Sequence, residues 1–257
     1  MGRRLSDYQV NENILDPVAR AVSWFGRIYN DYEVEGLENI PTEGPALVVF
    51  YHGLVPLDLW YCGLLYYLET GRKARALGDD FLFKIPGLGS LVSSIGGVPG
   101  DPKLAVELLK DGNVVGVSPG GVREAISGAD NDYKLVWGNR QGFARVALEA
   151  KVPIVPGFTR NVEGLYRAPF AGTSFVQNLY EKTRWPLVPI VGVGALPFPV
   201  KLVSHIGEPI PYDPNDSPAT LVGKTRSALE RLIAENQPKD STVLTGLEEN
   251  WIERLKR

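Results

Sequence analysis

The residue of this chain best suited to proton-transfer chemistry is His52, one of only two histidines. An apolar run over residues 46–51 ends directly before it, Gly53 follows, and Asp58 lies two residues after Pro56. This pattern predicts a buried strand that delivers His52 to its carboxyl end and a helix that opens at Pro56. A neutral imidazole accepts a proton from a hydroxyl group near neutral pH, and a carboxylate such as Asp58 fixes its tautomer. The spacing alone is also compatible with a chance pair.

A second candidate group lies in the glycine-containing stretch that follows the predicted strand over residues 113–117. It contains Ser118, Pro119, Gly120, Gly121, Val122, Arg123 and Glu124. Free backbone N–H groups of such a turn hold an oxyanion or a polar head group, and an Arg binds a carbonyl, phosphate or carboxylate group in a bidentate manner. The alternative is an ordinary strand-to-helix turn in which Arg123 pairs with an acid. The spacing of a nucleotide-binding phosphate loop is absent, and so is a dinucleotide fingerprint.

Strands alternate with helices along the chain, which predicts an α/β fold with a mostly parallel central sheet flanked by helices. We expect strands over residues 32–37, 46–51, 74–77, 113–117, 152–158, 187–191 and 201–206. We expect helices over residues 56–69, 103–110, 142–150 and 217–235, and a last, poorly anchored helix over 244–257. Functional groups of such a sheet gather at the carboxyl ends of its strands, where His52, the 118–124 stretch and residues 159–161 fall.

Residues 13–30 have the apolar spacing of an amphipathic helix, with Asp16 and Pro17 as a start signal. Two interpretations stay open at this stage. The helix either covers the core, or it lies in a membrane surface with Trp24 and Phe25 inserted.

Residues 81–100 are apolar but rich in Gly and Pro, and Lys84 is their only charge. We expect a short helix, a loop and a strand near 95–98. The segment either forms a wall of a lipid-binding groove or simply connects two elements. Further on, residues 127–132 are predicted to form a disordered loop.

The composition argues against several classes of protein. A net charge of −3 with scattered Lys and Arg residues argues against a nucleic-acid binder. The single cysteine, Cys62, excludes an internal disulfide, and the scarcity of cysteine and histidine argues against a metal site. The second histidine, His205, lies in a predicted strand away from acidic residues in the sequence, and we expect it to be structural.

No stretch reaches the roughly 18 uninterrupted apolar residues of a membrane span. The nearest, residues 185–200, contains four prolines, and residues 1–13 do not resemble a signal peptide. We therefore expect no membrane span, and we divide the chain into an N-terminal amphipathic helical segment (1–31), an α/β domain (32–240) and a C-terminal helical tail (241–257).

Five stretches, in this order, resemble sequence blocks of the glycerolipid acyltransferases: YHGLVPLD (51–58), FLFKIPGLGSLVSSIGGVP (81–99), VVGVSPGGVREA (114–125), GFARVALEAKVPIVPGFTRN (142–161) and KLVSHIGEPIPYDP (201–214). The resemblance is closest to the diacylglycerol acyltransferase-like branch, of the transmembrane-protein-68 type. It implies a glycerol-phosphate acyltransferase-like fold and transfer of a fatty acyl group to a glycerolipid hydroxyl. It also implies acyl-CoA as co-substrate, no cofactor, and a peripheral position on a membrane surface or its cytoplasmic face.

The same resemblance assigns roles to residues. His52 is implied as the general base and Asp58 as its orienting partner. The implied acceptor-binding residues are Pro119, Gly120, Gly121, Arg123 and Glu124. Lys84, Thr159, Arg160 and Asn161 are weaker candidates for lining the site.

Three departures from the family pattern bear on the acceptor. Five residues separate His52 from Asp58, where the phospholipid-making members usually have four. The loop reads Pro-Gly-Gly-Val-Arg rather than Pro-Glu-Gly-Thr-Arg, so only Glu124 is left to replace the missing acid. The block over 98–101 ends in Asp101 rather than Arg. Because a phosphate dianion needs more than one cation, the sequence favours a neutral acceptor, mono- or diacylglycerol.

Three other functions stay open. One is a lysophospholipid acyltransferase. Another is a lipid hydrolase, although the Gly-x-Ser-x-Gly nucleophile motif is absent around Ser118. The third is a catalytically impaired lipid-binding protein, which the longer His–Asp spacing and the missing loop acid favour.

Overall fold

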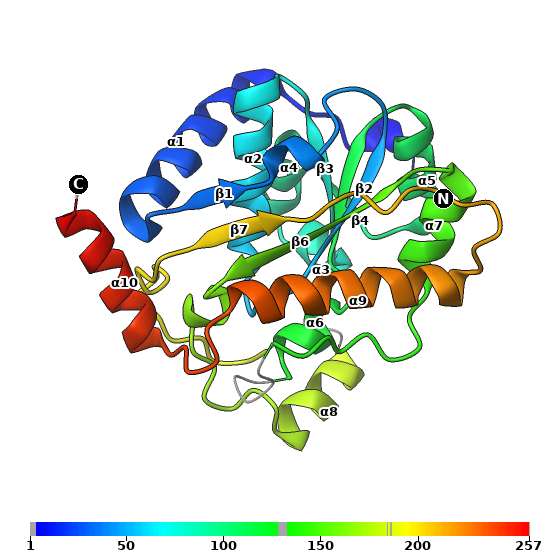
Figure 1. Ribbon diagram of the computed structural model, residues 1–257. Coiled ribbons are helices and arrows are strands. Elements are labelled where there is room, and N and C mark those ends of the chain that lie inside the picture. Colours follow the sequence, from blue (N-terminus) through cyan, green and yellow to red (C-terminus); the bar gives the residue numbers. More distant parts are fainter. Residues whose placement is uncertain (1–3, 128–132, 184, 186, 257) are drawn as a thin grey trace.

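A seven-stranded sheet forms the middle layer of the computed structural model, which describes residues 4–127, 133–183, 185 and 187–256 (Figure 1). The strand order is β1-β7-β6-β2-β5-β3-β4. The strands are β1 (Glu33–Glu35), β2 (Ala46–Phe50), β3 (Ala74–Gly78), β4 (Gly97–Pro99), β5 (Val114–Val117), β6 (Ile154–Arg160) and β7 (Val203–Ile206). Neighbouring strands run parallel except β6 and β7, which are antiparallel. The predicted mostly parallel α/β sheet is therefore confirmed.

Helices cover both faces of the sheet. The helices are α1 (Glu12–Asn30), α2 (Leu57–Thr70), α3 (Asp80–Lys84), α4 (Leu88–Ser94), α5 (Pro102–Lys110), α6 (Gly121–Ala125), α7 (Gly142–Ala150), α8 (Ser174–Thr183), α9 (Pro218–Asn236) and α10 (Val243–Leu255). Side chains of α5, α7 and α9 form one hydrophobic core cluster with the sheet, and side chains of α2 form another. No described helix is long and apolar enough to cross a membrane.

Strand β2 shows why an unbroken apolar run forms the centre of this sheet. All five of its residues are buried. Leu47 and Val49 contact the α5–α7–α9 cluster, whereas Val48 and Phe50 contact the α2 cluster. A central parallel strand is covered on both faces, so it has no solvent-facing positions for polar residues. This burial fixes the position at which His52 leaves the sheet.

Helix α1 packs through Leu15 and Ala19 against Leu64 of α2. Trp24 points outward and is 65% exposed, whereas Phe25 packs on the core and stacks on Tyr29. The helix therefore covers the core, and only Trp24 of the two predicted inserting residues is available for a surface contact. It begins at Glu12 with the Asn11 side chain as its cap, so Pro17 is an internal residue and the predicted start signal is wrong.

The segment over 81–100 contains two short helices, α3 and α4, rather than one, before β4. The predicted stretch 118–124 is not all loop, because α6 begins at Gly121. Of the predicted disordered loop over 127–132, residues 128–132 lie outside the described residues.

Two predictions near the C-terminus are wrong. Residues 187–191 do not form a strand, and only Val191 makes an isolated bridge, with Arg167. Helix α10 is well anchored, since the Asn250 amide donates to the Tyr29 carbonyl at 2.9 Å and Glu249 pairs with Arg160. A proline-interrupted apolar run has the composition of a strand but lacks some of the N–H groups that strand pairing needs. Helix α10 is held by buried polar contacts, which the periodicity of its sequence does not indicate.

Candidate active site

The carboxyl ends of three neighbouring parallel strands bring the candidate residues to one edge of the sheet. Val49 of β2 pairs with Val117 of β5, and Phe50 pairs with Gly157 of β6. His52 and Ser118 therefore follow adjacent strands and leave the sheet at nearly the same level. Ligands of open α/β sheets bind at this edge.

The His52 imidazole is held by its own turn. Its Nδ1 lies 2.6 Å from the carbonyl oxygen of Gly53. Because that oxygen only accepts hydrogen bonds, Nδ1 carries the proton and Nε2 keeps its lone pair. Burial lowers the pKa of His52 below its ordinary value, although the Gly53 carbonyl acts in the opposite direction. The geometry thus provides a neutral imidazole with Nε2 available as a base.

Asp58 is buried in the first turn of α2, and its predicted bond to His52 is absent. Neither carboxylate oxygen has a hydrogen-bond partner within the part of the chain that the structure describes. Burial raises the pKa of Asp58 to about 6, although the nearby Thr159 hydroxyl lowers it. Thr159 in turn contacts the Ser204 hydroxyl at 2.7 Å, and Ser204 contacts the Tyr32 hydroxyl at 2.9 Å. Asp58 therefore faces a chain of buried hydroxyl groups.

Glu124 clamps the backbone beside His52. Its Oε2 accepts the backbone N–H of His52 at 3.2 Å, and its Oε1 accepts the N–H of Val136 at 2.7 Å. Burial raises the pKa of Glu124 to about 7. A Cβ atom at position 120 would lie 2.1 Å from Oε2, so Gly120 is required for this arrangement. The loop acid thus supports the histidine turn instead of facing the cavity.

Arg140 holds the loop after β5 in place. Its Nη1 donates to the carbonyls of Pro119 at 2.7 Å and of Gly120 at 2.5 Å. The N–H of Gly121 donates to the Ser118 carbonyl at 3.1 Å, so this N–H group of the turn is not free as predicted. Arg123 is exposed and lies 3.7 Å from Glu181. This is the acid-paired arrangement that the sequence left open.

A second buried acid lies behind the histidine. Tyr51 is buried and donates its hydroxyl to Glu163 Oε1 at 2.5 Å. Burial raises the pKa of Glu163 to about 7. Its charge also acts on Tyr51, whose pKa is raised chiefly by burial. Residues 162–164 form a single helical turn after β6, so β6 contributes to the support of the site.

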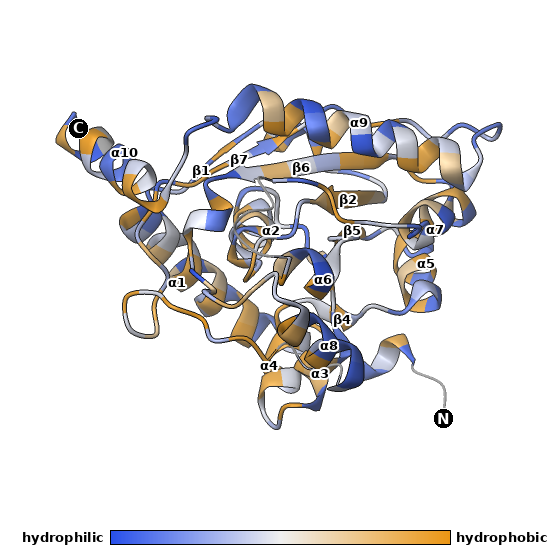
Figure 2. Cartoon of the chain, turned by 90° about the horizontal axis from the view of Figure 1, so that it is seen from below, coloured by the Kyte–Doolittle hydropathy of each residue, from blue (hydrophilic) through white to orange (hydrophobic). Residues whose placement is uncertain are grey.

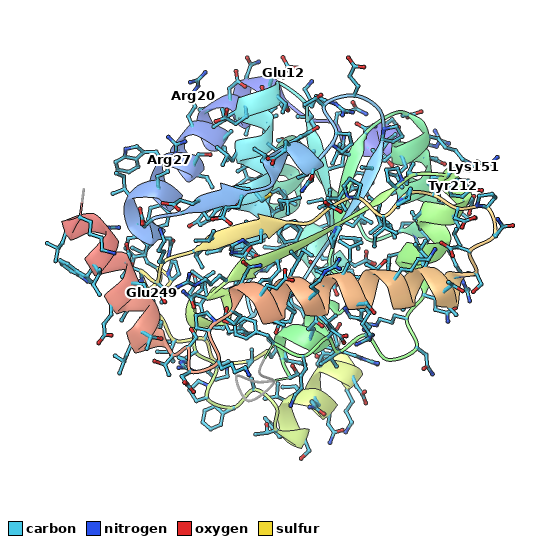
Figure 3. The ribbon with its side chains drawn as sticks, viewed as in Figure 1. Glu12, Arg20, Arg27, Lys151, Tyr212 and Glu249 are labelled. Atoms are coloured by element: carbon cyan, nitrogen blue, oxygen red, sulfur yellow. The ribbon has the colours of Figure 1, made fainter. Side chains whose placement is uncertain are left out.

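The weaker candidates lie in different places. Lys84 lines the cavity described below. Arg160 pairs with Glu249 at 2.5 Å, and Asn161 donates to the Lys201 carbonyl and to Glu249, both at 3.0 Å. These two side chains hold α10 on the sheet (Figure 3 labels Glu249 on that helix).

A cavity of about 1150 Å³ opens beside His52, lined mostly by apolar side chains. Pro119, Gly121 and Ser118 also line it. The charged lining residues in the described part of the chain are Asp79, Asp80, Lys84, Asp101 and Arg140. The apolar walls suit long hydrocarbon chains, and His52 lies at the wall where the strand ends meet.

Arg140 and Glu163 contribute contacts to the site that the sequence did not predict, whereas Ser118 belongs to the predicted stretch over 118–124. The Ser118 Oγ is buried without a hydrogen-bond partner in the described ranges, and Ser118 lines the cavity. Arg140 and Glu163 act through contacts to residues at least 20 positions away. Only the Ser118 position, directly after a buried strand, carried a signal in the sequence.

Comparison with known proteins adds independent information. Residues 31–159 match the model of the family described as acyltransferase, and residues 102–221 match that of diacylglycerol acyltransferase. The chain is 41% identical over 250 residues to a Bos taurus protein named "DGAT1/2-independent enzyme synthesizing storage lipids", covering 96% of this chain and 73% of that protein. The Gallus gallus protein of the same name is 43% identical over 231 residues, covering 90% and 68%.

The fold is similar to the crystal structure of the 1-acyl-sn-glycerophosphate acyltransferase from Thermotoga maritima. The TM-score is 0.58 at 22% sequence identity, over 87% of this chain and 82% of that one. At this identity the likeness concerns the fold alone.

Proposed function

The chain belongs to the glycerolipid acyltransferases, and on that premise we propose that it transfers a fatty acyl group from acyl-CoA to the hydroxyl group of a neutral glycerolipid, with His52 as general base. The observation that carries this proposal is the His52 ring itself. Its Nδ1 is bonded to the Gly53 carbonyl, its pKa is lowered, and it lines a large apolar cavity. A neutral base at the wall of a lipid-sized cavity is what activation of a lipid alcohol requires.

In the proposed reaction, Nε2 of His52 takes the proton from the acceptor hydroxyl as its oxygen attacks the thioester carbonyl carbon. The new C–O ester bond forms, the C–S bond breaks, and the CoA thiolate takes the proton from the imidazolium. The products are the acylated glycerolipid and CoA. We assign the Ser118 hydroxyl, which has no partner in the described chain, as a donor to the thioester oxygen when negative charge develops there.

We further propose that Asp58, with Thr159 beside it, supports the site without contacting the base, since no bond joins Asp58 to His52. The tautomer of His52 is then fixed by Gly53. In this proposal, Glu124, Gly120, Pro119 and Gly121 keep the His52 turn and the loop after β5 in register. Arg123 faces Glu181 at the surface, which favours a supporting position over direct acceptor binding.

The charges of the cavity favour a neutral acceptor. Among the described residues, Asp79, Asp80 and Asp101 line it together with two cations, and the Arg140 cation is already bonded to two loop carbonyls. A phosphorylated acceptor would place its charge near these acids. The name of the Bos taurus relative, an enzyme synthesizing storage lipids, points in the same direction. Mono- or diacylglycerol is therefore the proposed acceptor, and the substrates imply contact with a membrane surface.

The test is an acyltransfer assay with purified protein and labelled oleoyl-CoA. Monoacylglycerol, diacylglycerol, lysophosphatidate and water are offered as acceptors. We expect product with a neutral acceptor, and a loss of about a hundredfold or more in His52→Ala. His205→Gln is the matched control, because it removes the other imidazole, which lies on β7 and contacts Glu35 of β1 at 3.0 Å.

Other outcomes of this assay contradict the proposal. Transfer only to lysophosphatidate identifies a lysophospholipid acyltransferase, and release of free fatty acid alone identifies a hydrolase. Binding of acyl-CoA without turnover identifies a lipid-binding protein. Equal activity of the wild type and His52→Ala removes His52 from the role of base.

A further inference from the structure

The segment between α8 and β7 carries a concentration of exposed apolar side chains. Residues 185–200 contain no charged residue and no histidine. Within them, residues 187–196, which we call the apolar finger, expose Leu187, Ile190, Val191, Val193 and Leu196, each by 45% or more. In Figure 2 the segment is drawn mostly in orange at the edge of the molecule beside α1. Exposed aliphatic groups in such a contiguous run mark an interaction surface.

The finger has a defined backbone conformation. Val191 exchanges two backbone hydrogen bonds with Arg167, at 2.7 and 2.8 Å. Val193 and Leu196 exchange two more at 2.9 and 3.2 Å, and Gly194 at φ +65° makes the turn between them. The chain therefore holds these side chains outward by hydrogen-bonded structure instead of folding them into the core.

Two contacts place the base of the finger beside helices that carry further exposed aromatic groups. The Tyr29 hydroxyl of α1 donates to the Pro197 carbonyl at 2.8 Å, and Asn250 of α10 donates to the Pro199 carbonyl at 2.5 Å. Trp24 of α1 is 65% exposed and Trp251 of α10 is 66% exposed. Tryptophan prefers the boundary between hydrocarbon and water, so these rings suit the rim of a surface whose centre is the finger.

Positive charge flanks this surface. From Pro17 to its end at Asn30, α1 carries only Arg20 and Arg27 as charged residues. Both are exposed, and Figure 3 shows them pointing outward from the helix. Arg167, which is also exposed, pairs by its backbone with the finger. An uncharged centre flanked by arginines is complementary to a bilayer, in which hydrocarbon lies beneath phosphate groups.

The finger is also continuous with the cavity. Trp185, Val188 and Ile190 line the same cavity as His52. A lipid that enters between these side chains passes from the outer surface of the segment into the mostly apolar cavity that His52 lines. A protein partner would gain nothing from this continuity, whereas a lipid substrate requires it.

We propose that residues 187–196 insert into the surface of a lipid bilayer, and that this docking directs the mouth of the cavity to the lipid acceptor. The proposal deepens the proposed function and rests on it for the identity of the lipid. The occupant of the surface is the bilayer itself, and Trp24 and Trp251 contact its interface.

The test is co-sedimentation of the full chain with phosphatidylcholine vesicles, with and without added phosphatidylserine. In the double variant Val193→Asp/Leu196→Asp, we expect the partition coefficient to fall by at least about tenfold, because two inserted aliphatic groups are replaced by charges. Neither residue lines the cavity. Ala234→Asp on the exposed face of α9 adds the same kind of charge elsewhere and should bind as the wild type does. Val193→Trp should bind more tightly.

Several results overturn this proposal. The first is that the wild type does not bind vesicles, and the second is that the double variant binds them as well as the wild type does. The third is that the wild type is a dimer and the double variant is a monomer. Thermal unfolding of each variant verifies that it folds. Activity is measured separately with acceptor dispersed in detergent, where the double variant should retain wild-type turnover. Vesicle binding without turnover by the wild type would contradict the proposed function and leave the docking surface standing.

Discussion

Gly120→Ala is the sharpest test of how the site is built. The φ of Gly120 is −63°, a value that any residue adopts, so alanine causes no backbone strain. The added Cβ would instead lie 2.1 Å from Oε2 and 2.2 Å from Cδ of Glu124. The Glu124 side chain must therefore leave its position, and its bonds to the N–H groups of His52 and Val136 are lost.

The expected cost follows from those two donors and depends on pH. Leaving two N–H groups unpaired costs on the order of 2–4 kcal/mol in the free energy of unfolding. The pKa of Glu124 is raised from 4.5 to about 7 in the fold, so its contribution to stability is present below pH 4.5 and is lost as the pH rises through 7. Releasing this carboxylate to water recovers part of that loss. The cost should therefore be largest below pH 4.5, and it should be larger at pH 5.5 than at pH 8 by up to about 2 kcal/mol.

Urea unfolding at the two pH values measures this difference, and kcat/KM should fall by about ten- to a hundredfold because the His52 backbone shifts. Gly223→Ala on α9 is the matched control, since a Cβ there meets nothing within 4 Å and Gly223 does not line the cavity. In a Glu124→Gly background, which also removes the Cβ that would lie 2.5 Å from the added atom, Gly120→Ala should cost less than about 0.5 kcal/mol. Additive effects of the two substitutions would refute the steric argument, and so would a cost that is equal at both pH values.

Three further substitutions test other parts of the structure. Ser118→Ala should lower kcat by about a hundredfold without changing the thermal midpoint, because its hydroxyl has no partner in the described chain; an unchanged kcat contradicts this role. Glu163→Gln keeps an acceptor for Tyr51 but removes a carboxylate whose pKa in the folded state is raised to about 7. Urea unfolding should therefore show a free energy of unfolding that is higher by up to about 3 kcal/mol at pH 8, and this difference should disappear near pH 4.5. A difference that does not depend on pH would contradict this reasoning. Asn161→Ala breaks the bonds to the Lys201 carbonyl and to Glu249 and should speed amide hydrogen exchange in α10, whereas unchanged exchange would mean that other contacts hold the helix.

Much of the fold follows from periodicity and from Gly and Pro positions. The helix over 142–150 is α7 to the residue, and Gly71 ends α2 in the left-handed conformation expected of such a cap. Strand β2 follows from its unbroken apolar run. These features depend on local sequence, so local patterns identify them.

The failures have a different cause. Helix α8 was not predicted, because only Val176 and Tyr180 of it are buried and its apolar stripe is correspondingly narrow. The finger over 187–196 has the composition of a buried strand, yet it lies at the surface. An apolar composition indicates that a segment favours apolar surroundings. It does not distinguish the core of the protein from another apolar medium.

The carboxyl edge of the sheet shows why the sequence predicted which residues gather there but not their contacts. His52 and Glu124 are 72 positions apart, and their bond exists because β2 and β5 are neighbours in the sheet. The five intervening residues take Asp58 into the first turn of α2, where it faces the hydroxyl of Thr159 from β6, while the Gly53 carbonyl accepts the imidazole proton. A base needs only some acceptor at Nδ1, and a backbone carbonyl satisfies that need as well as a carboxylate does. Spacing between His and Asp therefore carries little information about whether the base is functional, whereas the environment of Nε2 carries most of it.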